Sequence, residues 1–202
     1  MPSEYDPLFS GSRPGDDDLE PVRERFRAAG GPYLRAPWSW FTWALLLPAV
    51  ALLTPRVHRL AGPPGVLSAW SLVILLGGAV ELAVILRTSK RGARGTPLAS
   101  WVLRVQGNLS LVALALSAVL LWQDMTWAVP GVWLLLLGHS FYTLGGIAFE
   151  PFRAAGILYQ LGGVLALWPP WSDSAPLAVF AATTAIGNLW VGISVWRARR
   201  TG

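Results

Sequence analysis

The chain alternates between long apolar blocks and short polar connections along its 202 residues. Six apolar blocks cover residues 37–54, 66–87, 98–122, 127–148, 151–168 and 175–197. Each has close to the ~20 residues that a helix needs to cross a hydrocarbon core of ~30 Å. The connections, such as TSKRGARGTP and PPWSDSAP, contain the Pro, Gly and short polar residues that end helices. The pattern predicts an all-α, polytopic membrane protein, a bundle of six transmembrane helices.

Basic residues in the connections predict how the bundle is oriented, because Lys and Arg gather on the cytoplasmic side of a membrane. Only Arg56 and Arg59 lie in connections on one side. Twelve lie on the other: Arg23, Arg25, Arg27, Arg35, Arg87, Lys90, Arg91, Arg94, Arg153, Arg197, Arg199 and Arg200. Both termini are therefore expected in the cytoplasm. Arg greatly outnumbers Lys beside abundant Ala and Gly, and we interpret this as bacterial coding and a bacterial inner-membrane protein.

The first 36 residues differ from the rest and form the first predicted unit, a cytoplasmic tail ahead of a transmembrane domain at 37–202. Residues 1–17 are polar and contain an Asp run. From Asp18, Leu19, Val22, Phe26 and Ala29 recur at one-face spacing, which predicts a short amphipathic helix over about 18–29. We expect it to lie on the cytoplasmic leaflet. Docking onto a soluble partner is the competing interpretation.

Four polar side chains fall at a common predicted depth. Counted from the cytoplasmic end of each block, His139, Gln160 and Asn188 are nine residues in and Asn108 is ten. A rise of 1.5 Å per residue places them about 13–15 Å deep, near the midplane. Polar groups there are costly, so the layer is either a ligand site or a set of hydrogen bonds between helices. Interhelical bonding is the simpler explanation.

Glu81 and Arg104 form a second predicted feature. Each lies six residues from the cytoplasmic end of its block, on consecutive antiparallel blocks. Because either charge alone is costly in a membrane, we expect an intramembrane ion pair. Gly77 and Gly78 lie one turn away, where small residues let helices approach closely.

The composition excludes several kinds of chemistry. There is no cysteine, which removes disulfides, thiolate nucleophiles and iron–sulfur clusters. The two histidines, His58 and His139, are too few for a zinc site, and no nucleophile elbow or phosphate-binding glycine motif occurs. No cofactor is required. A single axial His139 is enough to hold one haem or chlorophyll-type macrocycle, a minor alternative.

Two functions of different class stay open. The first is a non-catalytic accessory or scaffolding subunit that contacts membrane lipids and partner membrane proteins. The alternative is a small transporter or ligand-binding protein that uses the layer around His139. The net charge of +5 does not indicate nucleic acid, because the basic residues border the apolar blocks and suit anionic lipid. No feature favours an enzyme.

Overall fold

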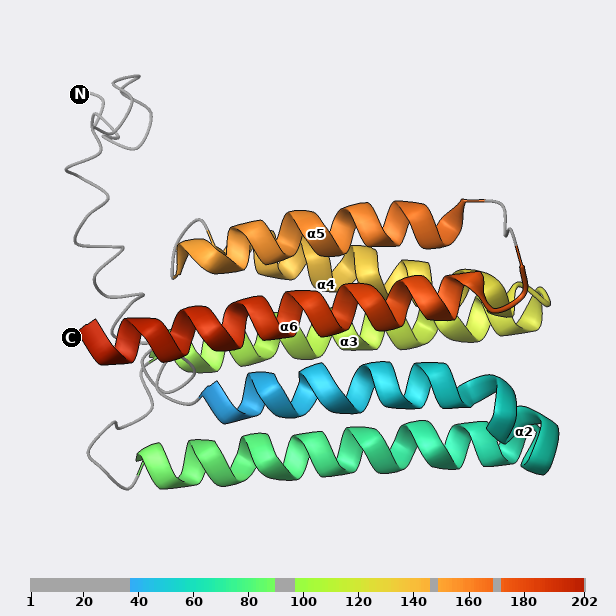
Figure 1. Cartoon of the computed structure of the whole chain (residues 1–202), viewed down its shortest axis with the longest axis horizontal. Coiled ribbons are helices and arrows are strands. Elements are labelled where there is room, and N and C mark those ends of the chain that lie inside the picture. The colour runs from blue at the N-terminus through green and yellow to red at the C-terminus, as the bar shows by residue number, and fades with distance from the viewer. Residues whose placement is uncertain (1–36, 90–96, 146–148, 169–171, 202) are drawn as a thin grey trace, which may run out of the picture.

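The computed structural model describes residues 37–89, 97–145, 149–168 and 172–201, and the described chain is helical (Figure 1). The elements are α2 (Pro37–Ser89), α3 (Pro97–Trp122), the short 3₁₀ helix η2 (Thr126–Ala128), α4 (Val129–Gly145), α5 (Glu150–Leu167) and α6 (Ala175–Thr201). The predicted tail and its amphipathic helix at 18–29 lie outside the described residues. The predicted all-helical fold is confirmed for the residues that the structure describes.

Helix α2 is two limbs joined at a sharp turn. Gly62 has φ 63°, a left-handed conformation that glycine adopts without steric cost. Pro63 and Pro64 follow it, and their missing N–H groups are tolerated in the first turn of a helix. We call residues 37–61 the first limb and residues 63–89 the second limb. The sequence pattern ended the first helix at residue 54, whereas the helix continues through Pro55 and turns back only at Gly62.

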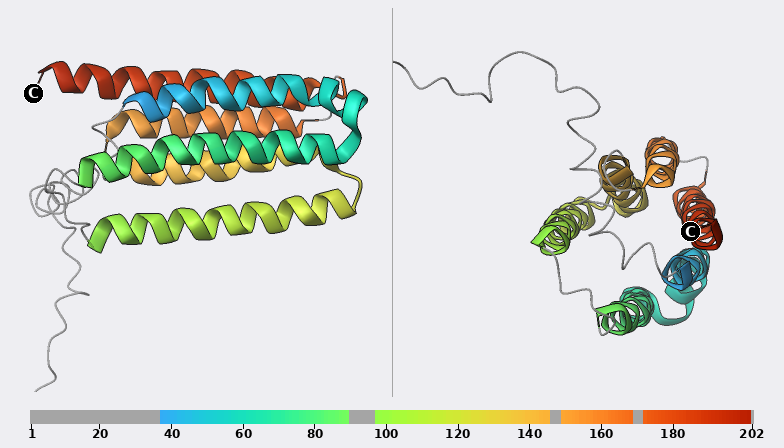
Figure 2. Two further views of the ribbon diagram at one scale, coloured as in Figure 1. Left: turned by 90° about the horizontal axis from the view of Figure 1, so that it is seen from below. Right: turned by 90° about the vertical axis from the view of Figure 1, so that its left-hand side faces the viewer.

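The helices form a ring in chain order (Figure 2). Going round it, the first limb is followed by the second limb, α3, α4, α5 and α6, and α6 packs back against α2. Residues 37, 89, 97, 145, 150 and 201 all lie at one end of the bundle, which we call the terminal end. The opposite end, with Gly62 and Asp124, is the turn end. These two residues are the positive-φ positions of the described chain.

Helices α4 and α5 are the most closely packed pair. Gly131, Gly138 and Gly145 recur every seven residues on α4 and face α5. A methyl group added to Gly138 would lie 2.8 Å from the Cγ and backbone N of Gln160 and 2.9 Å from the Gly156 carbonyl oxygen. The two backbones are thus nearly in contact, as small residues permit between membrane helices.

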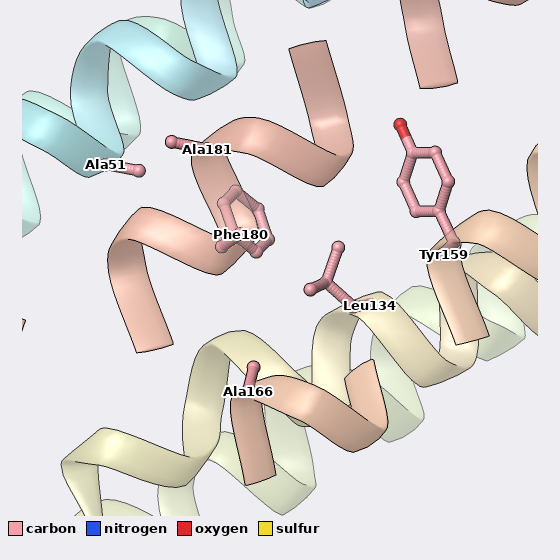
Figure 3. Packing of buried hydrophobic residues seen from close by; sticks show 6 residues of the cluster. All are labelled: Ala51, Leu134, Tyr159, Ala166, Phe180 and Ala181. Carbon is pink, nitrogen blue, oxygen red and sulfur yellow. The ribbon is translucent and has the colours of Figure 1, made fainter. Parts of the chain in front are cut away.

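The main core lies between α4, α5, α6 and the first limb. It contains the buried residues Ala51, Leu134, Tyr159, Ala166, Phe180 and Ala181. Figure 3 shows the methyl groups of Ala51 and Ala181 pointing toward one another. Nearer the terminal end, a second cluster joins Phe152 and Ala155 of α5 to Val191 and Val195 of α6. α6 therefore packs against α5 on one side and against the first limb on the other, which completes the ring.

Three described segments are long and apolar enough to cross a membrane: Pro37–Val84, Thr126–Gly145 and Ala175–Ala198. Gly107–Trp122 is a shorter apolar helix. Little of the first segment is buried inside the protein, which suits a surrounding of lipid. The described part of each of the six predicted blocks is helical, but crossing by all six stays a prediction.

Candidate functional site

The most deeply buried polar cluster joins α5 to α6. Asn188 is 3% exposed, and its Nδ2 donates to the Thr184 carbonyl oxygen at 2.8 Å. The hydroxyl of Thr184, fully buried, donates to the Phe180 carbonyl oxygen at 2.8 Å. The side chain of Tyr159, 1% exposed, makes a polar contact with Asn188. The cluster satisfies its own polar groups, as burial requires.

A glycine makes room for this tyrosine. The ring of Tyr159 lies against Gly187 of α6, so closely that any added methyl group would overlap it. The same ring meets Phe141 of α4 edge to face at 5.2 Å between centroids. Tyr159 thus contacts two neighbouring helices and carries its hydroxyl to Asn188. Such close, buried contacts are typical of helix packing rather than of an open ligand site.

A second polar contact joins the two limbs of α2. Glu81 on the second limb interacts with the side chain of Trp43 on the first, whose indole N–H is its only hydrogen-bond donor. The Trp43 ring covers Gly77, one turn before Glu81. Gly77 therefore makes room for the indole, and the indole gives the carboxyl group a polar partner within an apolar helix pair.

Two indole–hydroxyl clamps repeat along the chain. Trp70 Nε1 donates to Thr54 Oγ1 at 3.0 Å, and Trp133 Nε1 donates to Ser117 Oγ at 3.0 Å. Each tryptophan follows its hydroxyl partner by 16 residues, across a turn between antiparallel helices.

Each clamp hydroxyl also donates to the carbonyl four residues earlier, Thr54 to Val50 and Ser117 to Ala113. The second set of residues follows the first by 63 positions in all three cases: 50 and 113, 54 and 117, 70 and 133. The hairpin of the two limbs and the hairpin of α3 and α4 are thus held by the same device.

The four residues of the predicted polar layer have different surroundings. Asn188 is buried and Gln160 is half-buried against Gly138, whereas His139 and Asn108 are exposed. A shared ligand site for these four residues stays a prediction.

The predicted ion pair of Glu81 and Arg104 stays a prediction. Glu81 contacts Trp43, and Arg104 is exposed on α3. Another basic residue, Arg153 of α5, contacts Tyr142 of α4. Arg153 Nη2 donates to the Tyr142 hydroxyl at 3.3 Å, and the guanidinium lies 5.2 Å from the centroid of the Tyr142 ring. That contact lies at the terminal end, where α4 and α5 meet.

Acidic residues and histidines do not cluster among the residues that the structure describes. No group of three His, Asp or Glu residues lies close enough to hold a metal ion within the described ranges. One cavity of about 10 Å³ lies between α3 and α4, and an open depression of about 210 Å³ lies beside Arg56 and Arg59 at the turn end. The arrangement suits helix-to-helix contacts.

Comparison with protein-family models, curated proteins and solved structures found no match for this chain.

The sequence pattern missed the residues that tie the helices together. Trp43, Trp70, Trp133 and Tyr159 were not singled out, although each carries an interhelical polar contact. A signal for the clamps was present: Thr or Ser followed 16 residues later by Trp, repeated after 63 residues. A search for repeated pairs of polar and tryptophan residues would have found it.

Proposed function

We propose that this chain is a non-catalytic integral membrane protein, an accessory or scaffolding subunit of a membrane complex. In this proposal six helical segments, namely the two limbs of α2 and the helices α3, α4, α5 and α6, all cross a bacterial inner membrane. Both termini then lie in the cytoplasm. Three segments with the length and composition of membrane spans support the setting. The basic residues Arg87, Arg197 and Arg200, all near the terminal end, support the orientation.

The observation that carries the proposal is the exposure of Asn108 and His139. Asn108 lies within α3 and His139 within α4, each in an otherwise apolar stretch. A polar side chain facing hydrocarbon lacks hydrogen-bond partners, so such residues usually face protein. On this proposal a transmembrane helix of a partner protein lies along the outer surface of α3 and α4. Amide or hydroxyl groups on that helix would bond the two side chains.

The competing function, a transporter or ligand-binding protein, needs His139, Asn108, Gln160 and Asn188 to share one cavity. Asn188 instead bonds Thr184 and contacts Tyr159. The burial pattern therefore favours the subunit.

The experiment compares complexes kept in mild detergent for Asn108→Leu and His139→Leu with those of the unaltered chain. A control variant, Leu161→Ala, changes a side chain that is 64% exposed on α5. We expect native electrophoresis to show a larger complex that both polar substitutions disrupt and the control retains. Photo-crosslinking from position 139 identifies the partner helix. Equal migration of all four proteins as monomers would refute the proposal.

A further inference from the structure

One joint of the ring differs from all the others. The pairs α3 and α4, α4 and α5, α5 and α6, and α6 and α2 each pack together, and the two limbs are clamped by Trp70 and Thr54. No comparable packing joins the second limb to α3 within the described residues, although the two are neighbours in the ring (Figure 2). We call this joint the seam.

Two glycines on the seam helices have unusual surroundings. A methyl group added at Gly78 of the second limb, or at Gly107 of α3, would meet no atom within 4 Å. Every other glycine of the described chain would meet a side chain or backbone. In α4 and α5 the glycines are the points of closest approach. Gly78 and Gly107 thus resemble the glycines at which two helices pack closely, except that no neighbouring helix among the described residues contacts them.

Both glycines lie on the sides of their helices that border the seam. Gly78 follows Gly77, which faces Trp43, so it points about 100° further round the second limb. Gly107 precedes Ala113, which is buried against α4, by six residues and points about 120° away from it. With right-handed helices and the order of the ring in Figure 2, each rotation turns the glycine toward the neighbouring seam helix.

The two glycines also lie at one level. Gly78 is eleven residues before Ser89, and Gly107 is ten residues after Pro97, which places both roughly 15–17 Å from the terminal end. Glu81 and Arg104 match in the same way, eight residues before Ser89 and seven after Pro97. An antiparallel contact that opposes the glycines therefore also brings the carboxylate and the guanidinium to one level.

We propose that the seam closes within one chain: the second limb turns about Gly62 and packs Gly78 against Gly107 of α3. The clamp of Trp70 and Thr54 lies toward the turn end and can persist near the pivot. The contact of Glu81 with Trp43 lies toward the terminal end and is released, and Glu81 pairs with Arg104 instead. Exchange of the indole for the guanidinium keeps the carboxylate partnered in both states, which a buried charge requires.

Closure changes what the ring exposes. With the seam open, the flank of the second limb carrying Leu67, Ile74 and Gly78 is exposed. With the seam closed, it is covered by α3. The ring is then continuous, and its inward faces are separated from the bilayer. The inference does not depend on a partner subunit, because both surfaces belong to the same chain.

The absence of cysteine from the chain allows a direct test. The full-length variant Gly78→Cys with Gly107→Cys is oxidised in native membranes, and disulfides within one chain are separated from those between chains by electrophoresis. Both sites have open space, so the substitutions should not disturb folding. We expect an intrachain disulfide, because closure brings the Cα atoms within the ~4.4–6.8 Å that a disulfide spans. The control pair, Gly78→Cys with Leu121→Cys, lies far out of register and should not crosslink.

Charge reversal tests the proposed pairing in the same assay. Arg104→Glu should abolish the intrachain crosslink, and combining it with Glu81→Arg should restore it. The proposal is overturned if both cysteines react with maleimide but form no intrachain disulfide. A disulfide formed only between chains would also overturn it, and would make the seam a contact between two copies.

Discussion

Trp133 and Ser117 are linked across the α3–α4 hairpin by an indole–hydroxyl hydrogen bond of 3.0 Å, and Ser117 in turn donates to the carbonyl four residues before it. A serine hydroxyl both accepts and donates, so one side chain satisfies the indole and remains bonded to its own helix. Trp70 and Thr54 repeat this relationship 63 residues earlier. The clamps therefore fix the register of two hairpins whose helices have few other polar features.

Removing the hydroxyl of the second clamp should loosen the α3–α4 hairpin. We expect Ser117→Ala to lower the free energy of unfolding by about 0.6–1.7 kcal/mol, the range found for hydrogen bonds between membrane helices. Unfolding in detergent measures it. The control, Thr143→Ala, removes an exposed hydroxyl that bonds only within its helix, to the His139 carbonyl, and should change stability by less. Equal losses would show that the clamp adds nothing.

The glycine contact between α4 and α5 should not tolerate one extra methyl group. Gly138→Ala would place a carbon 2.8 Å from Gln160 and 2.9 Å from the Gly156 carbonyl, so the helices must separate. Overpacking of this kind costs about 1–3 kcal/mol, measured as a fall in the unfolding free energy. Ala154→Leu enlarges an exposed side chain on α5 and serves as the control. Unchanged stability of Gly138→Ala would contradict the packing.

The buried pair of Tyr159 and Asn188 should show coupling. Asn188→Leu leaves the Tyr159 hydroxyl buried without its partner, which costs about 1–3 kcal/mol, whereas removing both polar groups can be nearly neutral. We therefore expect the double variant Tyr159→Phe with Asn188→Leu to unfold at a higher temperature than Asn188→Leu alone. Additive losses in this mutant cycle would mean that the two side chains do not interact.

His139 should be dispensable for folding because its side chain is exposed. We expect His139→Ala to change the unfolding free energy by no more than about 0.5 kcal/mol, as is usual at surface positions. A large loss of unfolding free energy would instead show that the His139 side chain forms a hydrogen bond between helices of this chain. The absorption spectrum of the purified protein tests the minor macrocycle alternative. A Soret or red band that disappears in His139→Ala would establish a pigment ligand and refute a purely structural role.

The hydrophobic pattern predicted the helices well, because the length of an apolar block and the residues that end a helix can both be recognised in the local sequence. The blocks at 98–122 and 151–168 match α3 and α5 to within one residue at either end. The first block was predicted too short: it ended at residue 54, one residue before Pro55, whereas the helix continues to Gly62. Proline removes one backbone hydrogen bond, but the chain turned only where Gly62 adopted a left-handed conformation.

The neighbours of polar side chains could not be predicted in the same way. Periodicity gives the face on which a residue lies but not which helix covers that face. Asn188 and Asn108 were placed at one depth, yet one is buried and the other exposed. Glu81 was matched to Arg104 by depth, but its contact with Trp43 could not be predicted, because depth does not fix the rotation of a helix about its axis. Depth follows from counting residues, whereas rotation and packing depend on the whole ring.

The contact of α6 with α2 has a consequence for biosynthesis. The first limb is the earliest described helix to leave the ribosome, and its packing partner α6 is the last. Throughout elongation the side of the first limb that packs on α6 therefore stays uncovered, and the core containing Ala51 and Ala181 forms only after α6 has been synthesised. Chains that stall before residue 175 would have the first limb paired with the second limb through Trp70 and Thr54, but its α6-facing side would stay exposed. Such exposed apolar surface is where misassembly begins.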